Sequence, residues 1–415
     1  MRIVVALAVL LLLVVPRPAR AFSVLAHQAV VDRSWDGALV PALHARFGAV
    51  PHDQLERAHA FAYGGALIAD LGYFPLGNVL FTDLLHYVRS GDFVRALLDG
   101  ADTVDEYAFA LGALSHWVAD DTGHPEATNR VVADLYPKLR REYGDSVTYA
   151  DDHPAHLTTE FRFDVLQVAR SKAPPDLFRH AVAFEVAEPV LERAFLETYG
   201  LRLDDLFAST EVAITTYRWF FRELVHEATG IAWELYRADI QRLDPVATPK
   251  DFVYDLSRAD FEKEFGNAYR QPGYFARFVA FLVKLVPNAG PLRRMPYRPL
   301  PPTAQERFAA GFEHVVGRYR EAIGAERAHR LRLPNDILDT GRPTRRGEYE
   351  PADDAYAALL EKLETRQFAN VSADLRADLV RFYHEPRAGS ARAYDDESCN
   401  VLRALAELDA MSSAR

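Results

Sequence analysis

Apolar residues recur at helical spacing along most of this 415-residue chain, and this periodicity limits its fold more than any other feature. Runs in which Val, Ile or Thr alternate with polar residues between turn-forming pairs are scarce. The pattern therefore predicts an all-α protein without a sheet of any size. The segments that carry the helical pattern most clearly are 103–122, 177–199, 205–237 and 303–323.

Proline and glycine indicate where helices and domains end. Gly123 and Pro125 are expected to end the helix that precedes them. Residues 287–302 contain six prolines and one glycine, which is the composition of a linker. We therefore expect a helical domain at residues 22–286 and a further helical region at residues 303–415.

The start of the chain has the pattern of a secretory signal peptide. A short basic start is followed by an unbroken apolar run at residues 3–15, and Ala19-Arg20-Ala21 fits a small-x-small cleavage site. The alternative is a membrane anchor, but the run is shorter than the roughly 20 residues that span a bilayer. The prediction is a signal peptide at residues 1–21 and a mature chain that is secreted or periplasmic and begins at Phe22.

The overall charge and the cysteine content exclude several classes of protein. The formal net charge is −11, so the chain has no broad basic surface and no obligate nucleic-acid partner is expected. The lone Cys399 forms neither an internal disulfide nor a thiolate metal site. Of the 14 histidines, however, nine lie between His27 and His156, which points to chemistry in this part of the chain.

Two pairs of residues have the spacing of helical metal ligands. His116 and Asp120 are four residues apart in an apolar segment, so both project from one face of a helix. A buried carboxylate needs a partner or a metal; the alternative is a His–Asp pair that satisfies itself in the core. His156 and Glu160 repeat the spacing, and His124 follows the first helix. These donors predict at least two metal sites of a kind that zinc, iron or manganese accepts.

Taken in order, these residues resemble the zinc-dependent phospholipase C family and, more widely, the phospholipase C and single-strand nuclease superfamily. The resemblance covers about residues 22–165, in which Asp70 matches the Asp that the family has shortly before or within a helical hairpin. It implies a multi-helix fold and metal ligands at Phe22, His27, Asp70, His86, His116, Asp120, His124, His156 and Glu160.

The resemblance further implies up to three zinc ions, each with its own set of ligands. The first set is Asp70, His86, His116 and Asp120. The second set is His124, His156 and Glu160. The third set is His27, a bridging Asp120, and the free amine and carbonyl oxygen of Phe22. Because a peptide-bonded nitrogen has no available lone pair, only a chain cleaved before Phe22 completes the third set.

Two departures from the family pattern bear on function. Phe22 stands where family members usually have Trp, which matters little if only backbone atoms bind the metal. Only three residues separate Asp120 from His124, where many bacterial phospholipases C have five. The shorter spacing resembles the catalytic domain of glycosylphosphatidylinositol-specific phospholipase D. The spacing therefore leaves open whether the bond cleaved is the one cut by a phospholipase C or by a phospholipase D.

The resulting functional prediction is an exported zinc-dependent phosphodiesterase that hydrolyses phospholipids through metal-activated water, with phospholipase C regiochemistry. Asp70 is the candidate catalytic base, and the alternative is that it serves as a ligand only. Two other functions use the same tri-metal site: a single-strand nuclease or nucleotidase, and a phospholipase D. A further alternative of another class is a non-catalytic secreted metal-binding protein.

Other features carry less functional weight. His44, His52 and His59 fall outside the family order and are expected to be structural or on the surface. His153 is either a rival ligand or a residue that supports the ligands. The apolar segment 275–286 is expected to be a core helix, and the alternative is transient contact with a membrane surface.

Overall fold

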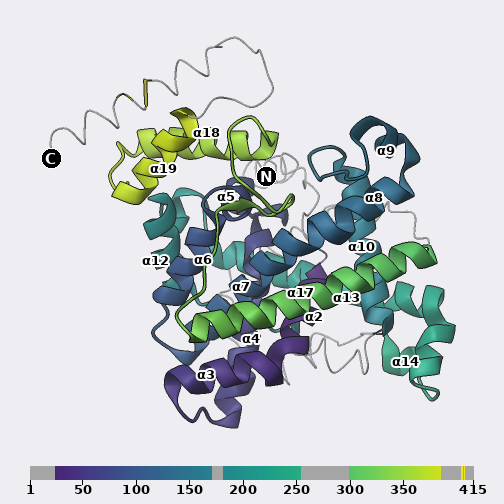
Figure 1. Cartoon of the computed structure of the whole chain (residues 1–415). Helices are drawn as coiled ribbons and strands as arrows, with labels where there is room; N and C mark the ends of the chain where they lie inside the picture. Colours follow the sequence, from purple (N-terminus) through teal and green to yellow (C-terminus); the bar gives the residue numbers. More distant parts are fainter. Residues whose placement is uncertain (1–23, 171–180, 254–298, 385–402, 405, 407–415) are drawn as a thin grey trace, which may run out of the picture.

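The computed structural model describes residues 24–170, 181–253, 299–384, 403–404 and 406 (Figure 1). These residues form a bundle of helices, so the all-α prediction is confirmed. The described part contains one small antiparallel sheet, in which β1 (Asp336–Ile337) pairs with β2 (Arg342–Pro343). Among the described helices, none combines the length and apolarity that crossing a membrane requires.

Two helices cross at the centre of the bundle, α4 (His52–Ile68) and α7 (Val104–Gly123). Glycines allow the close approach: a Cβ on Gly65 would collide with the backbone of Phe109, and one on Gly112 with the backbone of Ala62. At the start of α7, the Thr103 hydroxyl accepts a hydrogen bond from the amide of Glu106, 3.2 Å away, which caps the helix. The crossing brings the middle of α7 against the backbone of α4.

As the sequence predicted, the α-helix that precedes Pro125 ends at Gly123, but the chain stays helical beyond that point. The α-helical hydrogen bonding of α7 stops at Gly123, and the chain then continues through η3, a π-helical turn (His124–Thr128), into α8 (Asn129–Leu135). Pro125 is tolerated because it lies in the first turn of η3, where no backbone donor is needed. Single π turns are frequent at functional sites, and this one carries His124.

The other elements surround this central pair. They are α2 (Val24–Ser34), η1 (Trp35–Leu39), α3 (Val40–Phe47), η2 (Ala69–Tyr73), α5 (Val79–Tyr87), α6 (Ser90–Asp99), α9 (Pro137–Tyr143), α10 (His153–Arg170), α12 (Glu188–Tyr199), η4 (Leu203–Asp205), α13 (Thr210–Leu243), α14 (Pro249–Phe252), α17 (Pro302–Arg327), α18 (Glu350–Thr365) and α19 (Ala373–His384). Most of the buried apolar residues form a single core.

Three of the four predicted helical segments correspond closely to α7, α13 and α17. The fourth segment is interrupted: residues 182–187 are not helical, and α12 starts at Glu188. Pro189 in the first turn fixes that start, because it favours the first helical position and disfavours a helix running through it. The start of that segment, residues 177–180, lies outside the described part.

The C-terminal region packs on the central helices. Figure 1 shows α17 running along the bundle, where it contacts α7 and α2. The hydroxyl of the buried Tyr319 on α17 donates a hydrogen bond to the carbonyl of Leu111 on α7, at 2.8 Å. Residues 254–298 lie outside the description, and with them the segment 275–286 and most of the expected linker at 287–302. The domain boundaries therefore stay a prediction.

Candidate metal centre

Eight of the nine predicted ligands come together in the interior of the bundle. They lie on α2, η2, α5, α7, η3 and α10, and all are less than 5% exposed. Their potential ligand atoms form three groups, within each of which all atoms lie within 4.8 Å of one another. The groups are His27, His116 and Asp120; Asp70, His86 and His116; and His124, His156 and Glu160. The ninth predicted ligand, Phe22, lies outside the described residues.

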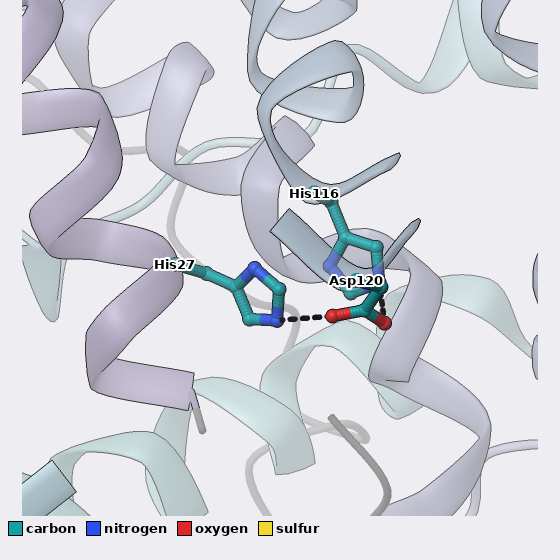
Figure 2. Close-up of side chains that lie close together, drawn as sticks. All are labelled: His27, His116 and Asp120. Carbon is teal, nitrogen blue, oxygen red and sulfur yellow. Dashed lines mark ion pairs between the residues drawn. The ribbon is translucent and has the colours of Figure 1, made fainter. Parts of the chain in front are cut away.

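Asp120 lies at the centre of the cluster. One of its oxygens, Oδ2, is 3.2 Å from Nε2 of His116 and 3.3 Å from Nε2 of His86. The other, Oδ1, is 3.3 Å from Nε2 of His27 and 3.4 Å from Nε2 of His124. Figure 2 shows the Asp120 carboxylate beside His27 and His116, with dashed lines that mark its ion pairs with both imidazoles. This geometry fits a carboxylate that bridges two metal ions.

His86 and His116 face one another with their Nε2 atoms 3.1 Å apart. Nδ1 of His86 donates a hydrogen bond to the Thr82 carbonyl at 2.8 Å, and Nδ1 of His116 donates to the Ala66 carbonyl at 2.9 Å. Both rings, when neutral, therefore carry a bare lone pair on Nε2. Two lone pairs at this distance repel unless a cation lies near both, so the arrangement favours a metal ion.

Asp70 completes this side of the cluster from the short 3₁₀ turn η2. The side chain of Thr82 holds the turn, because Oγ1 accepts a hydrogen bond from the Gly72 amide at 2.8 Å and donates one to the Ala69 carbonyl at 2.7 Å. The Asp70 side chain is 0% exposed, and none of the described residues donates a hydrogen bond to either of its oxygens. A buried carboxylate without donors is costly, and a bound cation removes that cost.

The third group lies where η3 meets α10. Nδ1 of His156 is 2.8 Å from Oε1 of Glu160, and Nε2 of His124 is 3.9 Å from the same oxygen. Nε2 of His156 donates a hydrogen bond to Oδ1 of Asn129 at 2.8 Å, so its Nδ1 faces Glu160 as a lone pair. On the outer side of His124, Nδ1 lies 3.0 Å from Oδ1 of Asp339.

The histidines and carboxylates of the cluster shift one another's pKa values. Although burial raises the pKa of Asp120, the neighbouring histidines, His116 foremost, hold it well below its usual value. Burial lowers the pKa of His116, but the Asp120 carboxylate outweighs it and brings the value to about 9. Burial and the charge of His116 lower the pKa of His27 to about 4. Burial and nearby carboxylates raise the pKa of Asp70 well above its usual value.

The donor set fits zinc. It contains only imidazole nitrogens and carboxylate oxygens, in three groups of three residues, and zinc accepts both kinds of donor. Ligands about 2.0–2.1 Å from a tetrahedral zinc lie about 3.3 Å from each other. The contacts around Asp120, at 3.2–3.4 Å, match that separation. The cofactor prediction of zinc, with up to three ions, is thus supported by the geometry and chemistry of these residues.

The histidines that the sequence analysis did not assign as ligands belong to none of the three donor groups. His44 is exposed and contacts the Gly48 carbonyl, and His52 is exposed. His59 stacks on Trp35 and lies 3.1 Å from a carboxylate oxygen of Asp32. The exposed ring of His153 lies against Tyr149, 4.1 Å between centroids. His153 belongs to none of the donor groups found among the described residues.

Sequence reasoning missed two residues that contact the candidate ligand histidines, Asn129 at His156 and Asp339 at His124. Asn129 follows His124 by five residues, so a helix that continued through Pro125 would have placed the two residues near each other. A break was expected at Pro125, and Asn129 was therefore not considered. Asp339 lies far along the chain in the turn between β1 and β2. No local pattern connects it to the cluster.

Comparison with known proteins agrees with the geometry. Residues 26–208 match the family model described as zinc dependent phospholipase C, so the predicted family resemblance is confirmed over this segment. No curated protein and no solved structure matches the chain. The matched segment contains all eight clustered donors, whereas Asp339 lies beyond it.

Proposed function

We propose that this chain, whose residues 26–208 match the family model of zinc dependent phospholipase C, is an exported zinc-dependent phosphodiesterase that hydrolyses phospholipids. The proposed cleavage is of the phospholipase C type, which releases diacylglycerol. One observation carries the proposal: eight buried imidazole and carboxylate side chains from distant parts of the sequence converge in three adjoining donor groups. A structural His–Asp pair does not require this convergence.

The chemistry requires positive charge at a phosphate and an activated water. Zinc ions bound together supply both, because they neutralise phosphate oxygens and lower the pKa of water. The role of the protein is to hold the donors in place before the substrate arrives. Asp120 fixes the spacing between neighbouring donor groups, since its two oxygens face different histidines. His86 and His116 are held in the ligand tautomer by the carbonyls that their Nδ1 atoms contact.

Asp70 is the proposed candidate for a second task. Its carboxylate has two oxygens, so one can bind a metal ion while the other accepts a proton from the attacking water. Burial and nearby carboxylates raise its pKa, which favours proton uptake, whereas a bound cation favours the ionised form. A ligand-only role for Asp70 is the simpler assignment and remains the alternative.

The proposed location rests on the first residues of the chain. The basic start, the apolar run and the small-x-small site at residues 1–21 support export, with a secreted or periplasmic mature protein. Cleavage before Phe22 would supply the free amine of the third ligand set. A phospholipid substrate in turn implies transient contact with a membrane surface.

The central experiment combines metal content with product identity. The mature chain, residues 22–415, is purified without added metal, its bound metals are measured by mass spectrometry, and it is then assayed on phosphatidylcholine vesicles. We expect at least two equivalents of zinc and release of diacylglycerol, with activity lost on chelation and restored by zinc.

Other outcomes of this experiment contradict specific parts of the proposal. Phosphatidic acid as the product indicates phospholipase D cleavage, and mononucleotides released from single-stranded DNA without lipid hydrolysis indicate a nuclease. Fewer than two metal equivalents, together with indifference to chelators, overturns the catalytic role altogether. A refolded precursor that retains residues 1–21, yet binds three zinc ions and is fully active, overturns the role of Phe22.

A further inference from the structure

A small hairpin from the C-terminal region is docked against the metal centre. It consists of β1, β2 and the turn 338–341 between them, all beyond the segment that matches the family model. The amide of Leu338 donates a hydrogen bond to the carbonyl of the ligand residue His86, at 3.1 Å. Directly after β2, the hydroxyl of Thr344 donates to the Tyr87 carbonyl at 2.9 Å. The hairpin is therefore tied to the end of α5.

The turn also lies close to the end of α7. Gly341 has a positive φ of 63°, and a Cβ at this position would lie 2.7 Å from the Asp121 carbonyl oxygen and 3.3 Å from Cγ of Pro125. A side chain is thus excluded both by backbone conformation and by space. The close approach puts the neighbouring residue of the turn, Asp339, beside the ligand on η3.

The Asp339 carboxylate is fixed by several donors. It is only 5% exposed, and Oδ2 accepts hydrogen bonds from the Tyr349 hydroxyl at 2.5 Å and from the Tyr149 amide at 3.0 Å. The other oxygen, Oδ1, lies 3.0 Å from Nδ1 of His124 and 3.6 Å from Nε2 of His156. It thus approaches His124 from the side opposite to Nε2, the nitrogen that faces Asp120.

The backbone of Asp339 reaches the second histidine of the same donor group. Its carbonyl oxygen accepts a hydrogen bond from Nδ2 of Asn129 at 2.8 Å. Oδ1 of Asn129 in turn accepts from Nε2 of His156 at 2.8 Å. One residue of the hairpin therefore acts on both histidines, directly on His124 and through Asn129 on His156.

We propose that Asp339 is a positioning residue of the metal centre, which holds His124 and, through Asn129, His156 in the orientation that binds zinc. The proposal rests on the proposed zinc function of the site. A carboxylate at one imidazole nitrogen fixes the proton there, leaves the lone pair on the other nitrogen and makes that nitrogen a stronger ligand. The C-terminal hairpin is, on this view, a part of the zinc site that the family segment alone lacks.

Zinc affinity tests the proposal without relying on turnover. Wild type, Asp339→Ala, Asp339→Asn and Tyr349→Phe are compared by zinc equivalents retained on dialysis and by competition with a chromophoric chelator. We expect Asp339→Ala to weaken one zinc equivalent by about 10–100-fold. Asp339→Asn, which keeps an oxygen but loses the charge, should weaken it less. Tyr349→Phe removes a single hydrogen bond to the carboxylate and should have the smallest effect.

Controls separate this role from a general effect on folding. Arg342→Ala changes an exposed side chain of the same hairpin and should leave zinc affinity unchanged. Circular dichroism and urea unfolding report whether each variant is folded; if Asp339→Ala is not, Asp339→Asn and Tyr349→Phe decide. Folded variants that bind every zinc equivalent as tightly as wild type overturn the proposal. If wild type itself binds no zinc, the proposed function fails first, and the two failures are thus distinguishable.

Discussion

The two sides of the metal centre hold their histidines by different means. On the side of Asp70, His86 and His116 donate hydrogen bonds from Nδ1 to backbone carbonyls, of Thr82 and Ala66. On the side of Glu160, the corresponding contacts are made by side chains, with Asn129 at His156 and Asp339 at His124. We call these the backbone-held side and the side-chain-held side.

This difference determines how each side responds to mutation. A carbonyl that belongs to a helix cannot be removed by substitution. The orientation of His86 therefore depends on α5 alone, and that of His116 on the contact between α4 and α7. An orienting side chain, in contrast, is lost by a single substitution. On the side-chain-held side, one of the two orienting residues, Asp339, comes from a hairpin far along the chain. The same ligand chemistry therefore rests on two kinds of support.

The largest expected effect comes from breaking both sides at once. Asp120 contacts histidines of both sides, so Asp120→Asn should disturb all donor groups that share it. Loss of a bridging charge removes several kcal/mol of electrostatic stabilisation, and we expect activity to fall by on the order of 10³-fold. Steady-state hydrolysis of phosphatidylcholine and zinc content by mass spectrometry measure the effect.

The matched control is Asp53→Asn, a change to an exposed carboxylate in the first turn of α4. It should leave both measurements at the wild-type level. Full zinc content together with wild-type activity in Asp120→Asn would show that the carboxylate does not connect the two sides.

The next effect separates the two sides. Asn129→Ala removes the acceptor for Nε2 of His156 and leaves every ligand in place. Loss of such an orienting partner typically costs 10–100-fold in metal affinity, so we expect one zinc equivalent to weaken by about 10-fold or more. Chelator competition measures this, with the exposed Asn370→Ala as control. Unchanged affinity of all equivalents would remove the distinction between the sides.

The sequence predicted the backbone-held side better than the side-chain-held side, for a physical reason. His116 and Asp120 share one helix face because helical spacing places them there, and the ordered donors pointed to the family. Gly123 and Pro125 suggested that the helical path ends there, yet it continues through the π turn η3. A proline near the start of a helical turn is tolerated because its missing N–H has no partner within that turn. Asp339 had no signal, since its role depends on how a distant hairpin docks.

A third prediction tests the robustness of the backbone-held side. Thr82→Val removes two hydrogen bonds that fix the turn carrying Asp70 but keeps the carbonyl that orients His86. The buried Gly72 amide then lacks its acceptor, so we expect a loss of about 1–3 kcal/mol in the free energy of unfolding. Zinc affinity should fall less than in Asn129→Ala.

Urea unfolding and chelator competition measure these two quantities. Thr216→Val is the control, because the Thr216 hydroxyl is also buried but bonds only within its own helix, to the Val212 carbonyl. A greater loss of zinc affinity in Thr82→Val than in Asn129→Ala would invert the comparison between the two sides.

The smallest expected effect concerns the docking of the hairpin against α7. Burial raises the pKa of Asp121 to about 7, and the negative charge of Asp336 on the hairpin adds to it. Since this pKa is higher in the folded than in the unfolded chain, the contribution of Asp121 to stability falls as pH rises from about 4 to about 7. Asp121→Asn should therefore raise the free energy of unfolding by about 1–2 kcal/mol at pH 8, after allowance for screening by solvent, and change it little at pH 4. Urea unfolding at the two pH values measures the difference. Equal effects of Asp121→Asn at both pH values would mean that the negative charge of Asp121 does not oppose docking of the hairpin that carries Asp339.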